Sequence, residues 1–220
     1  MFGGKLASNE RLFVKICGIT NESDAVASIK SGADALGFNI VPQSKRCIDL
    51  DAAAAWIGEL PNGIWKVAVT ADLNWEDACR IAQLPFIDAL QLHGNESPEF
   101  CRRLHDAGIA FAKALPVVDA ESLADVANYF TDTLILDSGM TGSFGGSGKV
   151  FPWNNARDFV RKNPALNVIL AGGLSPKNVA EAVSMVGPRG VDVTSGVEKE
   201  AGRKNHRLVK SFIRAARRAV

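Results

Sequence analysis

Two side chains that can exchange protons stand where buried segments of the chain end. Cys17 closes segment 11–17, and Asp137 follows the apolar run 134–136, Leu-Ile-Leu. A carboxylic acid can donate one proton while a thiolate removes another, as in general acid–base catalysis. Cysteine is also a common small core residue, but Gly18 leaves this thiol uncovered. The sequence therefore predicts Asp137 as acid and Cys17 as base, provided that the fold brings both to one site.

Glycine-rich turns could bind an anion beside these groups. Gly172-Gly173 and Ser195-Gly196 each follow a buried run, and Gly146-Ser147 lie within the longer segment 138–149. Glycine lets backbone N–H groups approach an anion closely, and a helix N-terminus adds partial positive charge. The alternative is that these glycines only permit tight turns. The repetition favours a phosphate site, so we predict a phosphorylated small molecule as the substrate.

The bulk composition excludes several classes of protein. The chain has 220 residues, 47% hydrophobic and 22% charged, and its net charge of +1 favours neither nucleic acid nor anionic membrane as a partner. Residues 1–10 lack the apolar core of a signal peptide, and no run reaches the roughly 18 residues of a membrane span. The four cysteines and three histidines lack zinc-site spacing, so we predict no metal and reduced thiols in a cytoplasm. We interpret the basic residues of segment 205–219 as a solvated outer face.

Buried runs and amphipathic segments alternate along the chain. The expected strands are residues 11–17, 34–40, 64–70, 87–92, 109–115, 133–136, 166–171 and 190–193. The expected helices are residues 21–32 (with Thr20 as N-cap), 50–60, 74–84, 97–107, 120–130, 153–162, 175–186 and 205–219. This alternation predicts an α/β chain with a single (β/α)8 TIM barrel over 11–220, after an N-terminal extension, 1–10, whose order the sequence leaves open. An open doubly wound sheet is the alternative, disfavoured because no Gly-x-Gly-x-x-Gly follows the first strand.

In such a barrel the carboxyl ends of the strands meet at one rim, where active sites are built. The loops after the seventh and eighth strands would then lie where this fold binds phosphate. Lys15 lies on the same side of its strand as Cys17, and its charge would favour a thiolate. The polar residues expected at this rim are Cys17, Asn39, Thr70, Gln91, His93, Lys113, Asp137, Asp192, Thr194 and Ser195.

Several segments together resemble a known family. They are residues 15–20 (Lys-Ile-Cys-Gly-Ile-Thr), 32–38 (Gly-Ala-Asp-Ala-Leu-Gly-Phe), 91–94 (Gln-Leu-His-Gly), 136–137, 171–179, and 190–193 with 195–198. In combination they resemble phosphoribosylanthranilate isomerase of tryptophan biosynthesis, from about residue 14 to 212. The resemblance implies a TIM barrel that catalyses the Amadori rearrangement of N-(5-phosphoribosyl)anthranilate to 1-(2-carboxyphenylamino)-1-deoxyribulose 5-phosphate. No cofactor would be needed, because the imine intermediate is itself the electron sink. Both monomers and homodimers occur in the family, so the oligomeric state stays open.

The resemblance also implies roles for individual residues. Asp137 would protonate the furanose ring oxygen, and Cys17 would take the proton from sugar C2. For that step Asp137 must be protonated at neutral pH, so burial or a nearby anion is expected to raise its pKa. Arg46 would face the anthranilate carboxylate, while Asp192 would either steady the substrate amine or only close its strand. The phosphate would lie on Gly172, Gly173, Ser195 and Gly196, with help from Gly146 and Ser147.

The chain departs from the family's pattern at five positions. Lys45 and Cys47 replace a proline and an aromatic residue around Arg46, while Ala68 and Thr70 replace a glycine and a phenylalanine in the third strand. Asn205 stands where an acid is common after the late glycine-lysine run. All five are expected on the anthranilate side of the site, where they would affect substrate preference and rate more than reaction type. Two alternatives stay open: a related TIM-barrel isomerase on another phosphosugar, or a non-catalytic phosphate-binding barrel.

Overall fold

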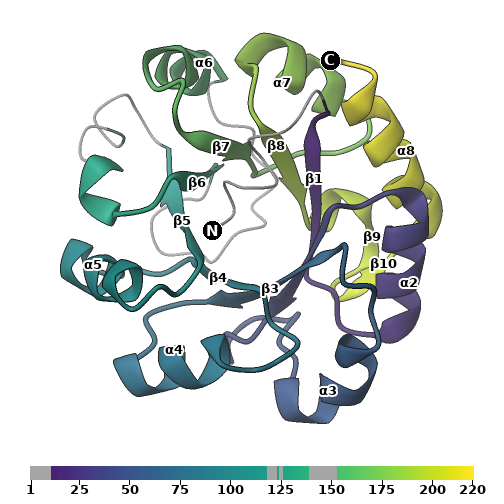
Figure 1. Ribbon diagram of the computed structural model, residues 1–220. Coiled ribbons are helices and arrows are strands. Elements are labelled where there is room, and N and C mark those ends of the chain that lie inside the picture. Colours follow the sequence, from purple (N-terminus) through teal and green to yellow (C-terminus); the bar gives the residue numbers. More distant parts are fainter. Residues whose placement is uncertain (1–10, 118–122, 124–125, 139–152) are drawn as a thin grey trace.

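Eight parallel strands close into a barrel, and each strand pairs with its neighbours in chain order (Figure 1). The computed structural model describes residues 11–117, 123, 126–138 and 153–220. β8 pairs with β1 in the register Phe13 with Gly190 and Lys15 with Asp192, which completes the ring. The strands are β1 (Phe13–Cys17), β2 (Ala35–Asn39), β3 (Trp65–Thr70), β4 (Ala89–Leu92), β5 (Phe111–Pro116), β6 (Thr133–Asp137), β7 (Asn167–Leu170) and β8 (Gly190–Val193). The predicted (β/α)8 barrel is confirmed, and the open sheet is excluded.

Helices surround the barrel in every direction (Figure 1). Those of the described residues are α2 (Glu22–Ser31), α3 (Leu50–Gly58), α4 (Trp75–Ala82), α5 (Pro98–Asp106), α6 (Trp153–Lys162), α7 (Val179–Val186) and α8 (His206–Arg217). Between β5 and β6, where an α-helix was expected over 120–130, the described residues form a 3-10 helix, η2 (Val126–Tyr129). The predicted helix is therefore wrong over that part, and residues 118–122 and 124–125 lie outside the described residues.

Two apolar layers hold the fold together. Small and branched side chains, among them Ala35, Val67, Ala112 and Ile169, fill the barrel interior. A larger cluster lies between the strands and the helices. Strands covered on both faces explain why their sequences are almost continuously apolar. The polar side chains that do point inward are therefore concentrated toward one end of the barrel.

Two helix starts differ from the sequence prediction. Asn21, not Thr20, caps α2, because its side chain accepts a hydrogen bond from the N–H of Asp24 at 2.9 Å. The Thr20 hydroxyl instead donates to the carbonyl of Gly202 at 2.5 Å. α7 begins at Val179 rather than near residue 175, since residues 175–178 form a turn. Both changes join the ends of helices to loops at the carboxyl rim.

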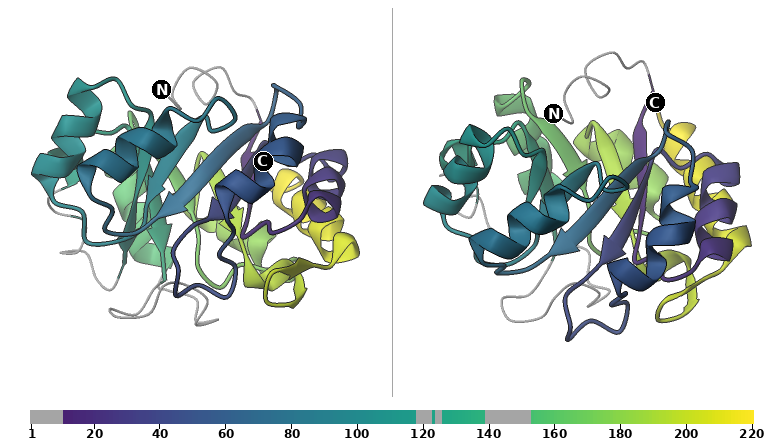
Figure 2. Two further views of the ribbon diagram at one scale, coloured as in Figure 1. Left: turned by 90° about the horizontal axis from the view of Figure 1, so that it is seen from below. Right: turned by 60° about the horizontal axis from the view of Figure 1, so that its bottom comes forward.

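A short antiparallel hairpin follows β8 and was not predicted. After a 3-10 turn, η3 (Ser195–Val197), strand β9 (Glu198–Glu200) pairs with β10 (Arg203–Lys204). In both views of Figure 2 the hairpin lies low on the molecule, below α8. It sits beside the start of α2, where the Lys204 N–H donates to Asp24 at 2.8 Å. The hairpin therefore belongs to the carboxyl rim.

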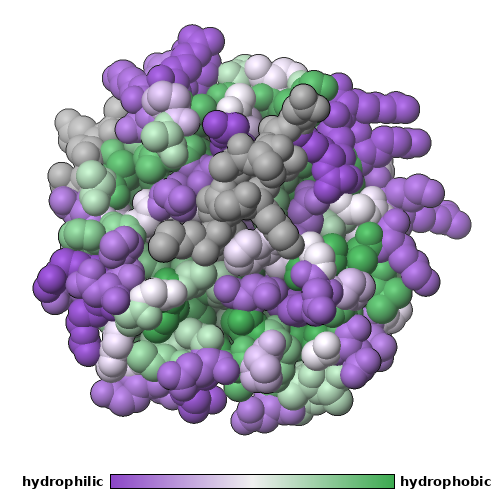
Figure 3. Space-filling model, in the orientation of Figure 1, coloured by the Kyte–Doolittle hydropathy of each residue, from purple (hydrophilic) through white to green (hydrophobic). Residues whose placement is uncertain are grey.

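The outer surface is hydrophilic around its edge. In Figure 3, hydrophilic side chains project from the periphery of the molecule, including the side that α8 occupies in Figure 1. The buried residues of α8 are Val209, Phe212, Ile213 and Ala216, so this face packs inward. That packing agrees with the interpretation of its basic residues as an outer face. In the described part of the chain, no helix is both long and apolar enough to cross a membrane.

Candidate active site

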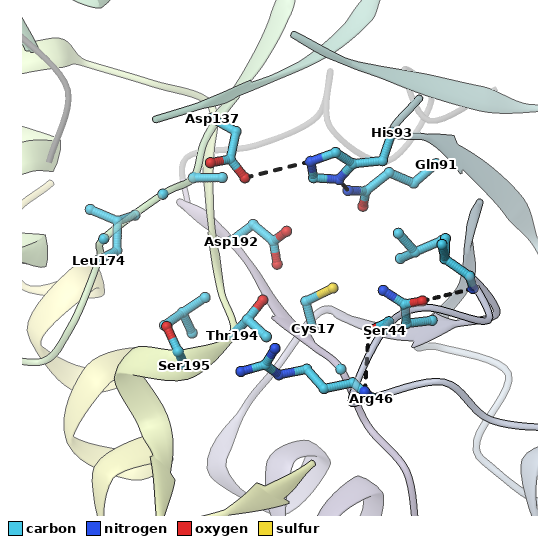
Figure 4. A pocket seen from close by; sticks show the side chains of 18 residues that line it. Cys17, Ser44, Arg46, Gln91, His93, Asp137, Leu174, Asp192, Thr194 and Ser195 are labelled. Carbon is cyan, nitrogen blue, oxygen red and sulfur yellow. Dashed lines mark hydrogen bonds and ion pairs between the residues drawn. The ribbon is translucent and has the colours of Figure 1, made fainter. Parts of the chain in front are cut away.

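A cavity opens at the carboxyl ends of the strands, and the residues drawn in Figure 4 line it. Both residues proposed for proton transfer from the sequence, Cys17 and Asp137, face this cavity. Of the ten polar rim residues expected there, all but Thr70 and Lys113 line it. The lining residues are Cys17, Gly18, Asn39, Val41, Ser44, Arg46, Val69, Gln91, His93, Asp137, Ala171, Gly172, Gly173, Leu174, Asp192, Val193, Thr194 and Ser195.

Cys17 lies beside a buried ion pair. The ammonium of Lys15 donates to Asp192 Oδ2 at 2.8 Å, and both side chains are buried. Gly37 makes room, because a Cβ there would lie 2.7 Å from the Cys17 sulfur and 3.0 Å from Lys15 Nζ. Burial opposes the charge of Lys15, but Asp192 and Cys17 outweigh that effect, so the pKa of Lys15 lies above its ordinary value. The sequence prediction that Lys15 and Cys17 share one side of β1 is confirmed.

Asp192 has one oxygen left for another partner. Its Oδ2 accepts from Lys15, whereas Oδ1 is buried and has no hydrogen-bond partner among the described residues. In Figure 4 the carboxylate lies between Asp137 and Cys17 and points into the cavity. A buried acceptor without a partner is costly unless a ligand supplies a donor. The arrangement suits a donor group on a bound ligand.

Arg46 reaches the cavity from the loop after β2 and is held by the hairpin. Its Nε donates to Glu198 Oε1 at 2.9 Å and its Nη2 donates to Oε2 at 2.6 Å. The buried ammonium of Lys204 donates to the same Glu198 oxygen, Oε1, at 3.0 Å. Burial raises the pKa of Glu198, but the hydrogen bonds from Arg46 and the charge of Lys204 outweigh it, so the net pKa is lowered. Sequence reasoning placed Arg46 at the site but assigned no role to Glu198 or Lys204, although Glu198 ended a segment that carried the resemblance.

His93 forms a short chain of contacts to Asp137 (Figure 4). Its Nδ1 lies 3.0 Å from Gln91 Nε2, and its Nε2 lies 3.8 Å from Asp137 Oδ2. Burial lowers the pKa of His93 most, and Lys15 and Lys113 add to this effect against two carboxylates, so the ring is neutral at neutral pH. Since the Gln91 amide donates to Nδ1, the proton of the neutral ring belongs on Nε2, toward Asp137. The sequence predicts Gln91 and His93 at the carboxyl rim but does not predict their contact with each other or with Asp137.

The glycines predicted to bind phosphate fall into two groups. Gly172, Gly173 and Ser195 line the cavity, and the side-chain amide of Asn178 holds this loop by donating to Gly173 O at 3.0 Å. Gly196 does not line the cavity. A Cβ at Gly196 would collide with the carbonyl of Leu174, so this glycine lets the loops after β7 and β8 pack together. Gly146 and Ser147 lie outside the described residues.

Substitution of Gly196 by alanine is expected to lower the free energy of unfolding by about 1–3 kcal/mol, because backbone must shift to admit the methyl group. Chemical denaturation measures the change. Gly58→Ala is the matched control, since a Cβ there meets nothing within 4 Å. Equal stability of the Gly196 and Gly58 variants would contradict the close packing of the two loops.

The five departures from the family's pattern lie outside the lining of the cavity, and one of them, Asn205, is the N-cap of α8. Ala68 belongs to the apolar cluster between strands and helices, and Thr70 is fully buried, with its hydroxyl 3.2 Å from Gln91 O. Lys45 and Cys47 are exposed on the loop that carries Arg46. None of the five lines the cavity. Alternation along β3 instead turns Val67 and Val69 inward, while Lys45 and Cys47 adjoin Arg46 in sequence.

Comparisons with known proteins agree along nearly the whole chain. The family model for N-(5′-phosphoribosyl)anthranilate (PRA) isomerase matches residues 14–215. The N-(5′-phosphoribosyl)anthranilate isomerase of Thermotoga neapolitana is 41% identical over 204 residues, which cover 93% of this chain and 98% of the relative. That of Rubrobacter xylanophilus is 38% identical over 205 residues, again covering 93% and 98%. The crystal structure of the Thermotoga maritima enzyme matches with a TM-score of 0.84 at 37% identity, covering 93% of this chain and 98% of that one.

A barrel with a polar cavity at the carboxyl ends of its strands defines the class of protein as a TIM-barrel enzyme. Within the described residues, no group of three or more His, Cys, Asp or Glu side chains could hold a metal ion. The chain belongs to the N-(5′-phosphoribosyl)anthranilate isomerase family of tryptophan biosynthesis, and it is an isomerase of this type. The family, the fold and the class of enzyme expected from the sequence are thereby confirmed.

Proposed function

We propose that the chain converts N-(5-phosphoribosyl)anthranilate to 1-(2-carboxyphenylamino)-1-deoxyribulose 5-phosphate, with Asp137 as general acid and Cys17 as general base. The observation that carries the proposal is that both side chains line one cavity, with Asp192 between them in Figure 4. A related crystal structure of the family, 36% identical with a TM-score of 0.80, contains reduced 1-(o-carboxyphenylamino)-1-deoxyribulose 5-phosphate. A phosphorylated ligand of this kind is therefore the substrate class we assign.

The reaction needs two proton transfers. Asp137 gives its proton to the furanose oxygen as the bond from C1 to that oxygen breaks, and the nitrogen lone pair forms the C1=N bond of a Schiff base. Cys17 then removes the proton from C2, and the C–H electrons form a C1=C2 bond while the imine electrons return to nitrogen. The enolamine tautomerises to the ketose. General acid–base steps of this kind each contribute about 10²–10⁴-fold to a rate.

The surroundings of each group suit its role. Lys15, Arg46 and Lys204 all interact electrostatically with Cys17, so three cations surround the proposed base. On the other side of the cavity, Asp137 Oδ2 lies 3.8 Å from His93 Nε2. The free oxygen of Asp192 is placed to accept from the substrate amine, while Arg46 would bind the anthranilate carboxylate.

The remaining ligand group is the phosphate. We place it on the cavity-lining backbone of Gly172, Gly173 and Ser195, where the loops after β7 and β8 meet. Gly196 supports this site by letting the two loops approach. The residues of the chain thus contact the phosphate, the amine and the carboxylate at separate places.

The test is direct turnover and genetic rescue. Purified protein is expected to convert N-(5-phosphoribosyl)anthranilate, and its gene is expected to restore growth without tryptophan to an auxotroph that lacks this isomerase. A panel of pentose phosphates without anthranilate should be left unchanged. Turnover of one of those sugars in place of the anthranilate substrate, together with failed rescue, would replace this proposal with an isomerase for another phosphosugar.

A further inference from the structure

The hairpin β9–β10 places a buried carboxylate and a buried ammonium directly behind Arg46. We propose that Glu198 and Lys204, here called the Glu198–Lys204 pair, are positioning residues that orient Arg46 and keep its positive charge available to the aromatic carboxylate of the substrate. The inference rests on the proposed function, because it takes Arg46 as the group that binds this carboxylate. Glu198 and Lys204 would thereby have a role in substrate binding, and the hairpin would serve to hold them behind Arg46.

Among the residues that the structure describes, the contacts leave one side of the guanidinium open. Glu198 takes the Nε and Nη2 positions of Arg46, at 2.9 Å and 2.6 Å. A guanidinium has five donors in a rigid fork, so the donors on Nη1 remain for a second carboxylate. Gly18 leaves room for the Arg46 side chain, because a Cβ there would lie 2.6 Å from Arg46 Cδ. The side chain is therefore held in one direction before any ligand binds, which lowers the ordering cost of binding.

Charge balance explains why a second cation is present. The charges of Arg46 and Glu198 alone would cancel, and a neutral pair would attract an incoming carboxylate only weakly. Lys204 shares the Glu198 carboxylate at 3.0 Å, with its side chain fully buried, so the three groups carry one net positive charge. Burial lowers the pKa of Lys204, and Glu198 works against this effect by attracting the ammonium.

The hairpin itself is anchored, so the pair has a fixed position. The N–H of Gly202 donates to Glu198 Oε1 at 3.2 Å, and the N–H of Lys204 donates to Asp24 at 2.8 Å. The Thr20 hydroxyl donates to Gly202 O at 2.5 Å. Lys204 Nζ also lies 3.2 Å from the carbonyl of Thr194, which lines the cavity. These contacts connect the start of α2 and the end of β8 to Arg46.

The experiment compares two ligands that differ only in the carboxylate. One is reduced 1-(o-carboxyphenylamino)-1-deoxyribulose 5-phosphate, and the other is its phenylamino analogue without the carboxyl group. Calorimetry gives both dissociation constants, and their ratio reports carboxylate recognition alone. In the wild type we expect the carboxylate to improve affinity by about 10- to 100-fold, as for a hydrogen bond between charged groups.

Glu198→Gln is expected to reduce that ratio by about 10-fold, because Arg46 loses its orientation while Lys204, without a carboxylate partner, tends to lose its charge. Lys204→Met is expected to reduce it similarly, because Glu198 then cancels Arg46. The affinity for the analogue without a carboxyl group should change by less than about 2-fold in both variants. For Glu198→Gln we also expect KM to rise by about 10-fold while kcat changes by less than about 3-fold.

Two further variants keep the test decisive. Glu198→Gln combined with Lys204→Met removes both buried charges, so it tests the same loss of ratio if one single variant fails to fold. Glu200→Gln lies on the same hairpin in an exposed pair with Arg203 and should leave the ratio unchanged. A wild-type ratio in a folded Glu198→Gln variant, or a wild-type ratio near one, would overturn the inference while turnover of the substrate by the wild type stands. Absence of that turnover would instead contradict the proposed function.

Discussion

Replacement of Cys17 by alanine is expected to lower kcat for N-(5-phosphoribosyl)anthranilate by about 10²–10⁴-fold, the usual contribution of a general base. The dissociation constant of the reduced product analogue should stay within about 3-fold of the wild-type value. The reason is that the sulfur faces the cavity at the end of β1, where as the proposed base it would remove a proton without anchoring the phosphate or the carboxylate. Single-turnover kinetics and calorimetry measure the two quantities.

The loss should come from chemistry and not from folding. Cys17 is only 7% exposed, yet it borders a cavity, so removal of its sulfur leaves no sealed void in the apolar core. Cys47→Ala is the matched control, because this thiol is exposed on the loop that carries Arg46 and does not line the cavity. A Cys17→Ala protein that turns over at the Cys47→Ala rate would remove the proposed base.

Much of the fold could be predicted because it depends on local patterns. Strands buried on both faces give apolar runs, and α6 and β8 begin and end at the predicted residues. The prediction for the segment after β5 is wrong, since the sequence predicts an α-helix there while Val126–Tyr129 fold as a 3-10 helix. The hairpin β9–β10 gave no signal at all, because its residues, Glu-Lys-Glu and Arg-Lys, show no apolar alternation.

The site could be predicted only as a set of residues that share a rim. Convergence of strand ends brought Cys17, Asp137 and Asp192 to one cavity. Side-chain pairing could not be foreseen, because Arg46 and Glu198 are 152 positions apart and no pattern in either segment points to the other. The side of β3 that faces the site was also missed, since an apolar run buried on both faces does not reveal its phase. Val69 therefore lines the cavity where Ala68 and Thr70 were expected.

The charged groups at the rim fall into units with different tasks. Two of these units are paired before any ligand binds. One is Lys15 with Asp192, and the other is Arg46 with Glu198 and Lys204. Little reorganisation of these charges is therefore needed during the reaction. His93 is neutral and adjoins Asp137 instead. Lys15, Arg46 and Lys204 also interact electrostatically with Cys17, so the paired cations are gathered on the side of the cavity where the proposed base lies.

Asp137→Asn is expected to lower kcat by about 10²–10⁴-fold, because an amide has nearly the shape of the carboxylic acid but cannot protonate the ring oxygen. Ligand affinity should again be retained, as measured by calorimetry with the reduced product analogue. Asp106→Asn, an exposed position on α5, is the control for the same change of side chain. Wild-type turnover in Asp137→Asn would show that ring opening does not depend on this carboxyl group.

A kinetic isotope effect separates the two roles. With substrate deuterated at C2, a Cys17→Ser variant should show a full primary isotope effect on kcat, because its weaker base makes proton removal limiting. Asp137→Asn should show an effect close to one, because ring opening, which breaks no bond at C2, then limits the rate. If Asp137→Asn gave the larger effect, Asp137 would have to act at C2, and the assignment of acid and base would be reversed. Equal effects in both variants would mean that the two side chains serve the same step.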